Sequence, residues 1–384
     1  MVVCQHYWPE GFRINDVVDF FVEKNLEVDV LCGIPNYPEG RFYTGYGYFK
    51  KRKQRHDNVN IYRVFEIPRG NNSNFMIFLN YISFPIASLA HLPKLLTKKY
   101  DKIYIHQLSP VMMGLAGIIL AKIKNIETTT YVLDLWPENL YSVIQFKNKL
   151  IKSILSHHSA WYYKNSDKLV ALSRKMKSRL QEATSSSKSI AILPQACEKV
   201  YENNIKDNQL IKKFKTGFNI VFAGNMSPAQ SFSTMIEAAK ILKSEGLGNI
   251  NWIMVGDGMS RQWLQDEVRA SGLGEIFFFE GHKKINEIPK YTYVADLLIG
   301  CLVKSAFLEA TIPGKVMSYI AAGKPIVLAM DGEVQGLVND KIKCGFVGPT
   351  EDPIALAANI RKVYEMRPKQ RAKLGENARV YHKQ

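Results

Sequence analysis

The stretch TIPGKVMSYIAAGKPIVLA, residues 311–329, joins a complete helix to a buried strand and is the most specific part of the chain. Pro313 and Gly314 precede the helix, and Lys315 lies in its first turn. Gly323 is placed to end the helix, and Pro325 opens the apolar run that follows. A helix that begins with free amides beside a lysine offers both a dipole and a cation to a diphosphate.

Working outward from this stretch, short apolar runs alternate with helical stretches on both sides. Residues 219–222, 251–255, 276–279 and 297–301 read as strands, with helices predicted at 232–245 and 260–271 between them. The same alternation runs through residues 2–193, after which a polar, lysine-rich stretch interrupts it near residue 200. Strands separated by helices predict a parallel, doubly wound α/β sheet, here twice.

Length and composition agree with two globular domains. The chain has 384 residues, and single cores seldom grow beyond about 250. Five cysteines lie far apart without a Cys-x-x-Cys pair, so neither a disulfide framework nor a zinc knuckle is expected. We therefore place domains at 1–200 and 201–384, with the ligand-binding edges of both sheets expected at a shared cleft. A nucleotide-dependent transferase, a two-domain dehydrogenase and a periplasmic-type binding protein remain open at this point.

Glycine-bearing turns follow several predicted strands. Gly11 follows the first strand, Gly224-Asn225 follows 219–222 with Gln230 further along the loop, and Val255-Gly256-Asp257-Gly258 precedes Arg261. Glu280-Gly281-His282 ends another strand. Each turn alone is weak evidence, and simple turn geometry would explain any one of them. The three turns of the second half lie at the strand ends of one sheet, and together they predict an anion-binding edge.

These residues resemble glycosyltransferase family 4, which has the GT-B fold of two Rossmann-like domains. The runs PEGFRINDVV (9–18), GIPNYPEGRFYTGY (33–46) and YVLDLWPENL (131–140) are more narrowly similar to bacterial N-acetylfucosaminyl and related amino-sugar transferases of O-antigen and capsule assembly. The resemblance implies an amino-terminal acceptor domain and a carboxy-terminal nucleotide-sugar domain. It implies that an N-acetylated amino-deoxyhexose is transferred from a UDP-sugar to a lipid-diphosphate-linked saccharide. It also implies retention of configuration at the anomeric carbon.

The resemblance also implies roles for individual residues. Catalytic roles fall on Asp134, near the reacting sugar or acceptor, and on Lys315. The donor-binding positions are Gly11, Gly224, Asn225, Gln230, Arg261, His282, Glu309, Pro313, Gly314, Lys315 and Ser318.

Three of these positions depart from the family pattern. A basic pair is common where this chain has Asn225 and Gln230, and a ribose-binding glutamate is common where it has Ser318. The second family glutamate would fall on Ala310, beside Glu309. Asp134 has a second reading, as a helix cap for the turn at Pro137. A catalytically weak GT-B scaffold and a non-hydrolysing sugar-nucleotide epimerase therefore remain alternatives.

Charge suggests a membrane partner. The net charge is +16, and most of the excess lies in residues 1–200. Basic runs at 50–55 and 94–99 flank the apolar stretch 75–92, which polar residues and Pro85 interrupt too often for a membrane span. A second group alternates lysines with apolar residues: Lys147, Lys149, Lys152 and Lys164 with Leu150, Ile151, Ile154, Leu155 and Trp161. Amphipathic helices packed on their own sheet would show the same pattern.

Further expectations concern partners and location. No nucleic-acid-binding motif is found, and no Asp-x-Asp or His/Glu cluster indicates a catalytic metal, so neither nucleic acid nor a metal or other cofactor is expected. The opening MVVCQHYWPEG does not read as a signal peptide. We expect a cytoplasmic protein held peripherally at an anionic membrane, on its inner face. The chain ends inside a helical run, which suggests a trimmed last helix.

Overall fold

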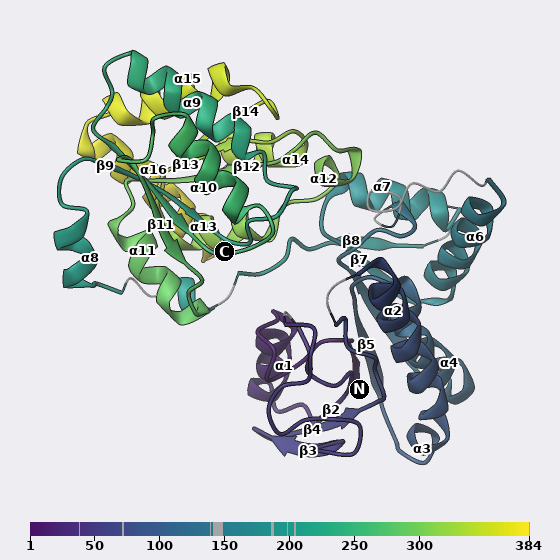
Figure 1. Ribbon diagram of the computed structural model, residues 1–384. Helices are drawn as coiled ribbons and strands as arrows, with labels where there is room; N and C mark the ends of the chain where they lie inside the picture. Colours follow the sequence, from purple (N-terminus) through teal and green to yellow (C-terminus); the bar gives the residue numbers. More distant parts are fainter. Residues whose placement is uncertain are drawn as a thin grey trace. The chain divides into compact units, whose positions relative to one another are not determined.

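The computed structural model describes residues 1–384 except 38, 71–72, 139, 141–148, 186–187, 198, 203–204 and 384, and leaves the side chains of 74, 151, 202, 306 and 307 undescribed. The chain forms two compact units, Met1–Pro194 and Gln195–Gln384 (Figure 1). Each unit is built on its own sheet.

The amino-terminal unit contains, in its described part, an eight-stranded sheet of order β3-β4-β2-β1-β5-β6-β7-β8. Its strands are β1 (Val2–Val3), β2 (Val28–Cys32), β3 (Lys53–His56), β4 (Val59–Arg63), β5 (Lys102–Gln107), β6 (Glu127–Val132), β7 (Lys168–Ala171) and β8 (Ile190–Ile192). Every pairing is parallel except that of β3 with β4. The sequence did not predict β3, because its side chains are charged or polar. Charges on such an edge strand discourage pairing with other chains.

Helices cover both faces of this sheet. They are α1 (Ile14–Glu23), α2 (Asn74–Ala90), α3 (Leu92–Leu96), α4 (Leu115–Lys124), α6 (Lys149–Asn165) and α7 (Arg174–Ala183), with a 3₁₀ turn, η1, at Val111–Gly114. Figure 1 shows α1 on one side of the sheet and α2, α3 and α4 together on the other. The apolar stretch 75–92 thus forms α2 and the start of α3. Across the described part of the chain, we find no helix with the length and apolar character of a membrane span.

The carboxy-terminal unit has a parallel sheet of order β11-β10-β9-β12-β13-β14. Its strands are β9 (Phe218–Ala223), β10 (Ile250–Val255), β11 (Phe277–Gly281), β12 (Leu297–Cys301), β13 (Ile326–Ala329) and β14 (Gly345–Gly348). In this order the chain reverses direction across the sheet between β9 and β12. Ligands of doubly wound sheets bind at the carboxyl ends of the strands at such a reversal.

The helices of this unit are α8 (Asn208–Lys213), α9 (Phe232–Ser244), α10 (Arg261–Ala270), α11 (Ile288–Val294), α12 (Ala306–Glu309), α13 (Gly314–Ala322), α14 (Glu333–Gln335), α15 (Pro353–Glu365) and α16 (Pro368–His382). Tighter or wider turns occur at η2 (Lys199–Glu202), η3 (Ile285–Glu287) and η4 (Gly336–Ile342). The predicted cap of α13 is confirmed, because Gly323 adopts a left-handed φ of 64° at its end.

The alternating burial of β9 explains why residues 220–223 are all apolar. Ile220 and Phe222 pack in one core with α9, α10 and α15, whereas Val221 packs in a second core with α13. A strand buried on both faces needs apolar residues at every position. This burial, shared by β10 and β12, fixes the sheet whose edge carries the candidate site.

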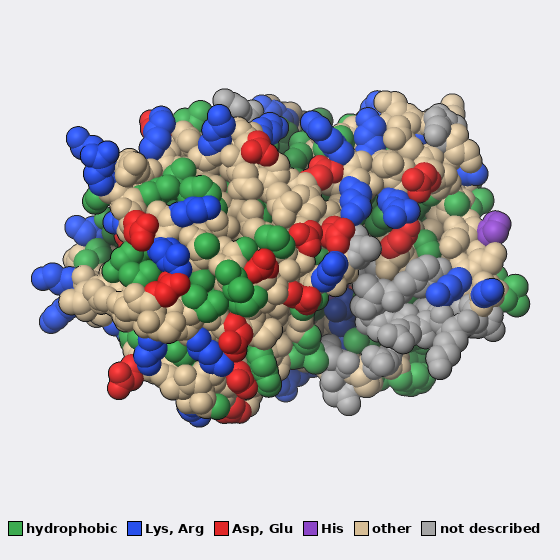
Figure 2. Space-filling model, turned by 90° about the horizontal axis from the view of Figure 1, so that it is seen from above, with side chains coloured by type: hydrophobic (Ala, Val, Ile, Leu, Met, Phe, Trp, Pro, Cys, Tyr) green, Lys and Arg blue, Asp and Glu red, His purple; other side chains and the backbone are tan. Residues whose placement is uncertain are grey.

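The cysteines and the basic side chains are distributed differently in the structure. All five cysteines are buried as thiols. On the face drawn in Figure 2, Lys and Arg side chains are scattered among acidic and apolar ones. The basic excess therefore does not gather into a single patch on that face.

Candidate functional site

Two glycine turns pack directly on each other at the carboxyl ends of β9 and β10. Gly224 and Gly256 have φ angles of 148° and 139°, which side chains rarely allow. A Cβ added to Gly256 would lie 1.9 Å from the carbonyl oxygen of Gly224. The amide of Gly224 donates to Val255 (3.0 Å), and that of Gly256 donates to Gly281 (2.9 Å). These turns thus form a bare backbone edge along three neighbouring strands.

Asn225 continues this edge as an exposed side chain. A Cβ on Gly258 would lie 2.5 Å from Asn225 Oδ1, so the amide oxygen rests against the backbone of the turn after β10. The amide of Met226 in turn donates to Asp257 at 2.8 Å. The predicted phosphate loop after β9 is therefore held in place partly by the turn after β10.

Lys315 lies at the reversal point of the sheet. Its Nζ donates to Gln230 Oε1 at 2.6 Å and lies 4.1 Å from the centre of the Phe222 ring. A Cβ on Gly224 would be 3.5 Å from this nitrogen, and one on Gly300 of β12 would be 3.6 Å from Lys315 Cδ. The structure therefore brings together three predicted site residues, Gly224, Gln230 and Lys315.

The environment of Lys315 changes its ionisation. Burial lowers the pKa of its ammonium to about 7, and the neighbouring Cys301 opposes that shift only in part. A cation with few partners gains most from a diphosphate, since the ligand replaces the water that burial removed. Pro313 and Gly314 lie beside it, as the N-cap and first residue of α13.

Ser318 lies one turn further along α13 and faces inward. Its side chain is 4% exposed, and its hydroxyl donates to the carbonyl of Gly314 at 3.3 Å. The carboxylate that the family pattern has here is thus replaced by a hydroxyl bonded within its own helix.

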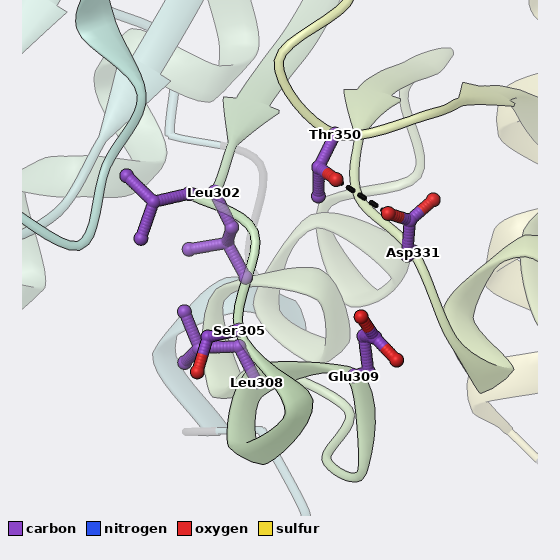
Figure 3. Close-up of a pocket in the computed structure, with 7 residues that line it drawn as sticks. Leu302, Ser305, Leu308, Glu309, Asp331 and Thr350 are labelled. Carbon is purple, nitrogen blue, oxygen red and sulfur yellow. Dashed lines mark hydrogen bonds between the residues drawn. The ribbon is translucent and has the colours of Figure 1, made fainter. Parts of the chain in front are cut away.

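Glu309 lines a small pocket beside this helix, together with Asp331, Thr350, Ser305 and Leu302. Figure 3 shows the Glu309 carboxylate pointing toward the side of the pocket that carries Asp331 and Thr350, whose hydroxyl donates to Asp331. Asp331 and Thr350 are new candidates that the sequence analysis missed. Both closely follow strands, β13 and β14, and that position was the signal that could have found them.

Arg261 and His282 lie at the far end of the edge. Arg261 Nη1 donates to Asp257 Oδ2 at 2.8 Å, and a Cβ on Gly281 would lie 3.8 Å from Arg261 Nη2. His282, directly after β11, is exposed. The two predicted residues are thus neighbours, with the charge of Arg261 already balanced by Asp257.

In the amino-terminal unit, Asp134 follows β6 and is bonded to the loop after β5. Its Oδ2 accepts hydrogen bonds from the Ser109 amide (2.9 Å) and hydroxyl (2.8 Å), while Trp136 Nε1 donates to the same hydroxyl. Burial raises the pKa of Asp134, and the bonds from Ser109 oppose the shift. Gly11 has open space around it, because a Cβ there would meet nothing within 4 Å.

Two buried polar groups near these strand ends were also missed. His6 Nδ1 lies 3.0 Å from Glu10 Oε2, and Glu10 Oε1 accepts the amides of Asn36 and Tyr37, each at 2.7 Å. Glu66 Oε1 accepts from Gln5 at 2.7 Å, in a pocket that a Cβ on Gly33 would fill. Spacing along the chain gave no signal, since the partners lie up to 61 residues apart.

The buried Glu66 gives a testable pH effect. Burial raises its pKa to about 7, with His6 the largest opposing charge and Glu10 adding to the shift. Between pH 4.5 and 7 the folded state keeps a proton that the unfolded state has lost, so stability falls as pH rises through this window. We expect Glu66→Gln to gain up to about 3 kcal/mol relative to the parent between pH 5 and 8, measured by urea unfolding.

Glu127→Gln is the matched control for this comparison. Hydrogen bonds from Lys102 and Lys168 lower the pKa of the half-buried Glu127. Its titration therefore lies below the window, and the stability difference of this variant should stay constant from pH 5 to 8. A constant difference for Glu66→Gln as well would show that Glu66 is ionised throughout.

The chain is similar to known glycosyltransferases in sequence. Residues 203–381 match the family described as "Glycosyl transferases group 1". A 2-deoxystreptamine N-acetyl-D-glucosaminyltransferase of Niallia circulans is 22% identical over 365 residues, covering 86% of this chain and 87% of that protein. The putative colanic acid biosynthesis glycosyl transferase WcaI of Escherichia coli is 21% identical, covering 85% of this chain and 82% of that one.

Solved structures share the architecture. HepE of Anabaena, in complex with UDP and glucose, has a TM-score of 0.68 at 14% identity and covers 99% of this chain and 93% of its own. WaaG, a glycosyltransferase of lipopolysaccharide biosynthesis, has a TM-score of 0.68 at 15% identity and covers 100% and 94%. The predicted fold class, two parallel-sheet α/β domains of the GT-B type, is confirmed.

Proposed function

We propose that this chain, a glycosyltransferase whose residues 203–381 match the group 1 family, moves a sugar from a UDP-sugar to a lipid-linked saccharide. The predicted enzyme class is confirmed by those matches, and the donor and acceptor are our proposal. The single observation that carries the donor is the meeting of Lys315, Gln230 and Gly224 at the reversal point of the second sheet. A diphosphate there would be held by one cation and by backbone amides.

The leaving group explains why Lys315 matters. When the bond between the anomeric carbon and the diphosphate breaks, negative charge grows on the departing oxygen. A poorly solvated ammonium beside the start of α13 would stabilise that charge more strongly than an exposed lysine. This arrangement would need no metal, and activity in the presence of EDTA tests that prediction.

For the sugar and base, the pattern of polar residues supports assignments on either side of Lys315. Glu309, Asp331 and Thr350 offer acceptors and a hydroxyl for sugar hydroxyls, while His282 and Arg261 would meet the nucleobase end. We propose an N-acetylated amino-deoxyhexose as the sugar. The Niallia relative, named as an N-acetylglucosaminyltransferase, supports an amino sugar, and the UDP bound in HepE supports the nucleotide.

The acceptor is proposed to be a saccharide on a lipid diphosphate, used in capsule or O-antigen assembly, with retention at the transferred carbon. The name of WcaI supports an exported polysaccharide. Asp134, hydrogen-bonded to Ser109, is the proposed group near the reacting carbon. Gly11 is proposed to approach the donor phosphates, for which its open surroundings leave room.

Exposed apolar residues support a peripheral membrane contact at the cytoplasmic face. On α2, Phe75 is 67% exposed, and Phe78 and Ile86 are also exposed. On α6, Leu150, Ile154 and Trp161 are exposed among lysines, although Lys147 lies outside the described residues. Apolar side chains between basic ones suit an anionic bilayer surface.

Thermal unfolding with UDP, GDP, ADP and dTDP, each with and without EDTA, tests the donor assignment. UDP at about 100 times its dissociation constant should add about 2.7 kcal/mol of stability in either condition. Lys240→Ala, on the exposed face of α9, is the control and should shift like the parent. If no nucleotide raises the melting temperature, the enzymatic proposal fails at its donor site and the scaffold alternative is favoured.

A further inference from the structure

We infer that Arg69 binds a phosphate of the acceptor's lipid diphosphate, an inference that rests on the proposed function. The observation behind it is an arginine held between two tyrosine rings and a buried amide, with no carboxylate paired to it in the described part of the chain. The ligand it fits is a phosphate monoester or diphosphate, since the guanidinium fork matches two phosphate oxygens.

A buried network fixes the amide that holds Arg69. Asn80 Nδ2 donates to Glu66 Oε1 and to the carbonyl of Ile67, each at 2.7 Å. Both amide hydrogens are thereby used, so Asn80 Oδ1 must face the other way. There it accepts from Gln5 Nε2 at 3.0 Å and from Arg69 Nε at 3.3 Å.

A buried polar network of this kind stabilises the fold only where its hydrogen bonds are made. Gln5, Glu66 and Asn80 are each at most 1% exposed. Among the residues that the structure describes, Glu66 Oε2 and Gln5 Oε1 have no hydrogen-bond partner, so the cluster is only partly satisfied. What it does achieve is one orientation of Asn80, and through it one orientation of Arg69.

Two aromatic rings further restrict the orientation of the Arg69 guanidinium. The guanidinium carbon lies 5.4 Å from the ring centre of Tyr37 and 5.6 Å from that of Tyr81. With Nε bonded to Asn80 and both rings within cation–π distance of the guanidinium, the Nη atoms of this half-buried residue are the donors for a ligand. Burial raises the pKa of Tyr81, with Arg69 opposing the shift and Asp134 adding to it, so both charges lie near its hydroxyl.

The position suits a lipid-linked anion. Gln5, Glu66 and Asp134 follow β1, β4 and β6, so the arginine lies at the carboxyl edge where the acceptor is proposed to bind. Asn80 and Tyr81 belong to α2, the helix that also exposes Phe75 and Phe78 near its start. One helix therefore connects the phosphate-binding arginine to side chains suited to a bilayer.

The test compares two acceptors that carry the same saccharide, one on a prenyl diphosphate and one on a neutral octyl group. With the diphosphate acceptor, Arg69→Gln should lower kcat/KM by about 10- to 100-fold, mainly through KM. With the octyl acceptor, its kcat/KM should stay within about 2-fold of the parent. Arg69→Lys keeps the charge but loses the two-pronged guanidinium. With the diphosphate acceptor, its kcat/KM should lie between those of the parent and Arg69→Gln. Arg179→Gln, an exposed arginine of α7, should change neither.

Other outcomes overturn the assignment. Equal losses with both acceptors would mean that Arg69 acts on the saccharide or on folding, and a lost UDP-induced stability shift would mean that it binds the donor. At a UDP-sugar concentration that saturates the proposed diphosphate site at Lys315, inorganic pyrophosphate should compete with the diphosphate acceptor in the parent and not in Arg69→Gln. If the parent itself responds to no nucleotide and transfers no sugar, the proposed function fails first, which the parent assays reveal independently.

Discussion

Lys315→Ala is expected to lower kcat by about 10- to 100-fold, because it removes the cation next to the proposed leaving group. The ammonium already lies against the Phe222 ring and Gln230, at the reversal point of the sheet. The measurement is steady-state release of UDP with acceptor present. Lys315→Arg keeps a charge and should retain more activity than the alanine variant, whereas turnover equal to the parent in Lys315→Ala would remove Lys315 from the mechanism.

The lowered pKa of Lys315 adds a pH signature to the same prediction. In the free protein the ammonium has a pKa of about 7, and a bound diphosphate must raise it, because opposite charge favours the protonated form. Affinity for UDP should therefore fall as pH rises from about 7 to about 8.5, a range that lies above most of the titration of the terminal phosphate and below that of the uracil ring. Calorimetric titration should show this fall in the parent and a flat profile in Lys315→Ala. A flat profile in the parent would mean that the lysine stays charged throughout.

The parts of this site that follow local rules were predictable from sequence. Pro313, Gly314 and Gly323 mark the ends of α13, and Lys315 is visible as a cation in its first turn. The glycine turns after β9 and β10 were also identified. The contact between these two turns could not be predicted from the sequence. Gly224 and Gly256 are 32 residues apart, and only the pairing of β9 with β10 brings them together.

The acceptor side was less predictable for a physical reason. Glu66, Asn80 and Gln5 look like surface residues in a sequence, because burial of such side chains is rare. Their partners come from two different strand ends and a helix, so no periodic pattern signals them. Strand β3 was missed in the same way, since its pairing to β4 depends on a neighbour and not on apolar side chains.

Gly256→Ala is expected to destabilise the carboxy-terminal unit by about 3 kcal/mol or more, the other large effect we predict. Two costs add. The backbone φ of 139° is strained for alanine, and the new Cβ would sit 1.9 Å from the Gly224 carbonyl oxygen. Neither neighbour can yield easily, because the Gly224 amide is bonded to Val255 and the Gly256 amide to Gly281. Urea unfolding, followed by tryptophan fluorescence, measures the loss.

Gly248→Ala separates this packing effect from the general effect of replacing glycine. A Cβ at Gly248 would meet nothing within 4 Å, so its unfolding free energy should change by less than about 0.5 kcal/mol. If Gly256→Ala is equally mild, the two turns must be able to move apart, and the bare edge formed by them is not rigid. If it is severe, the same variant should also lose UDP binding before it unfolds, because separating the turns moves Gly224 away from Lys315. The glycine would then be required both for the fold and for the phosphate site.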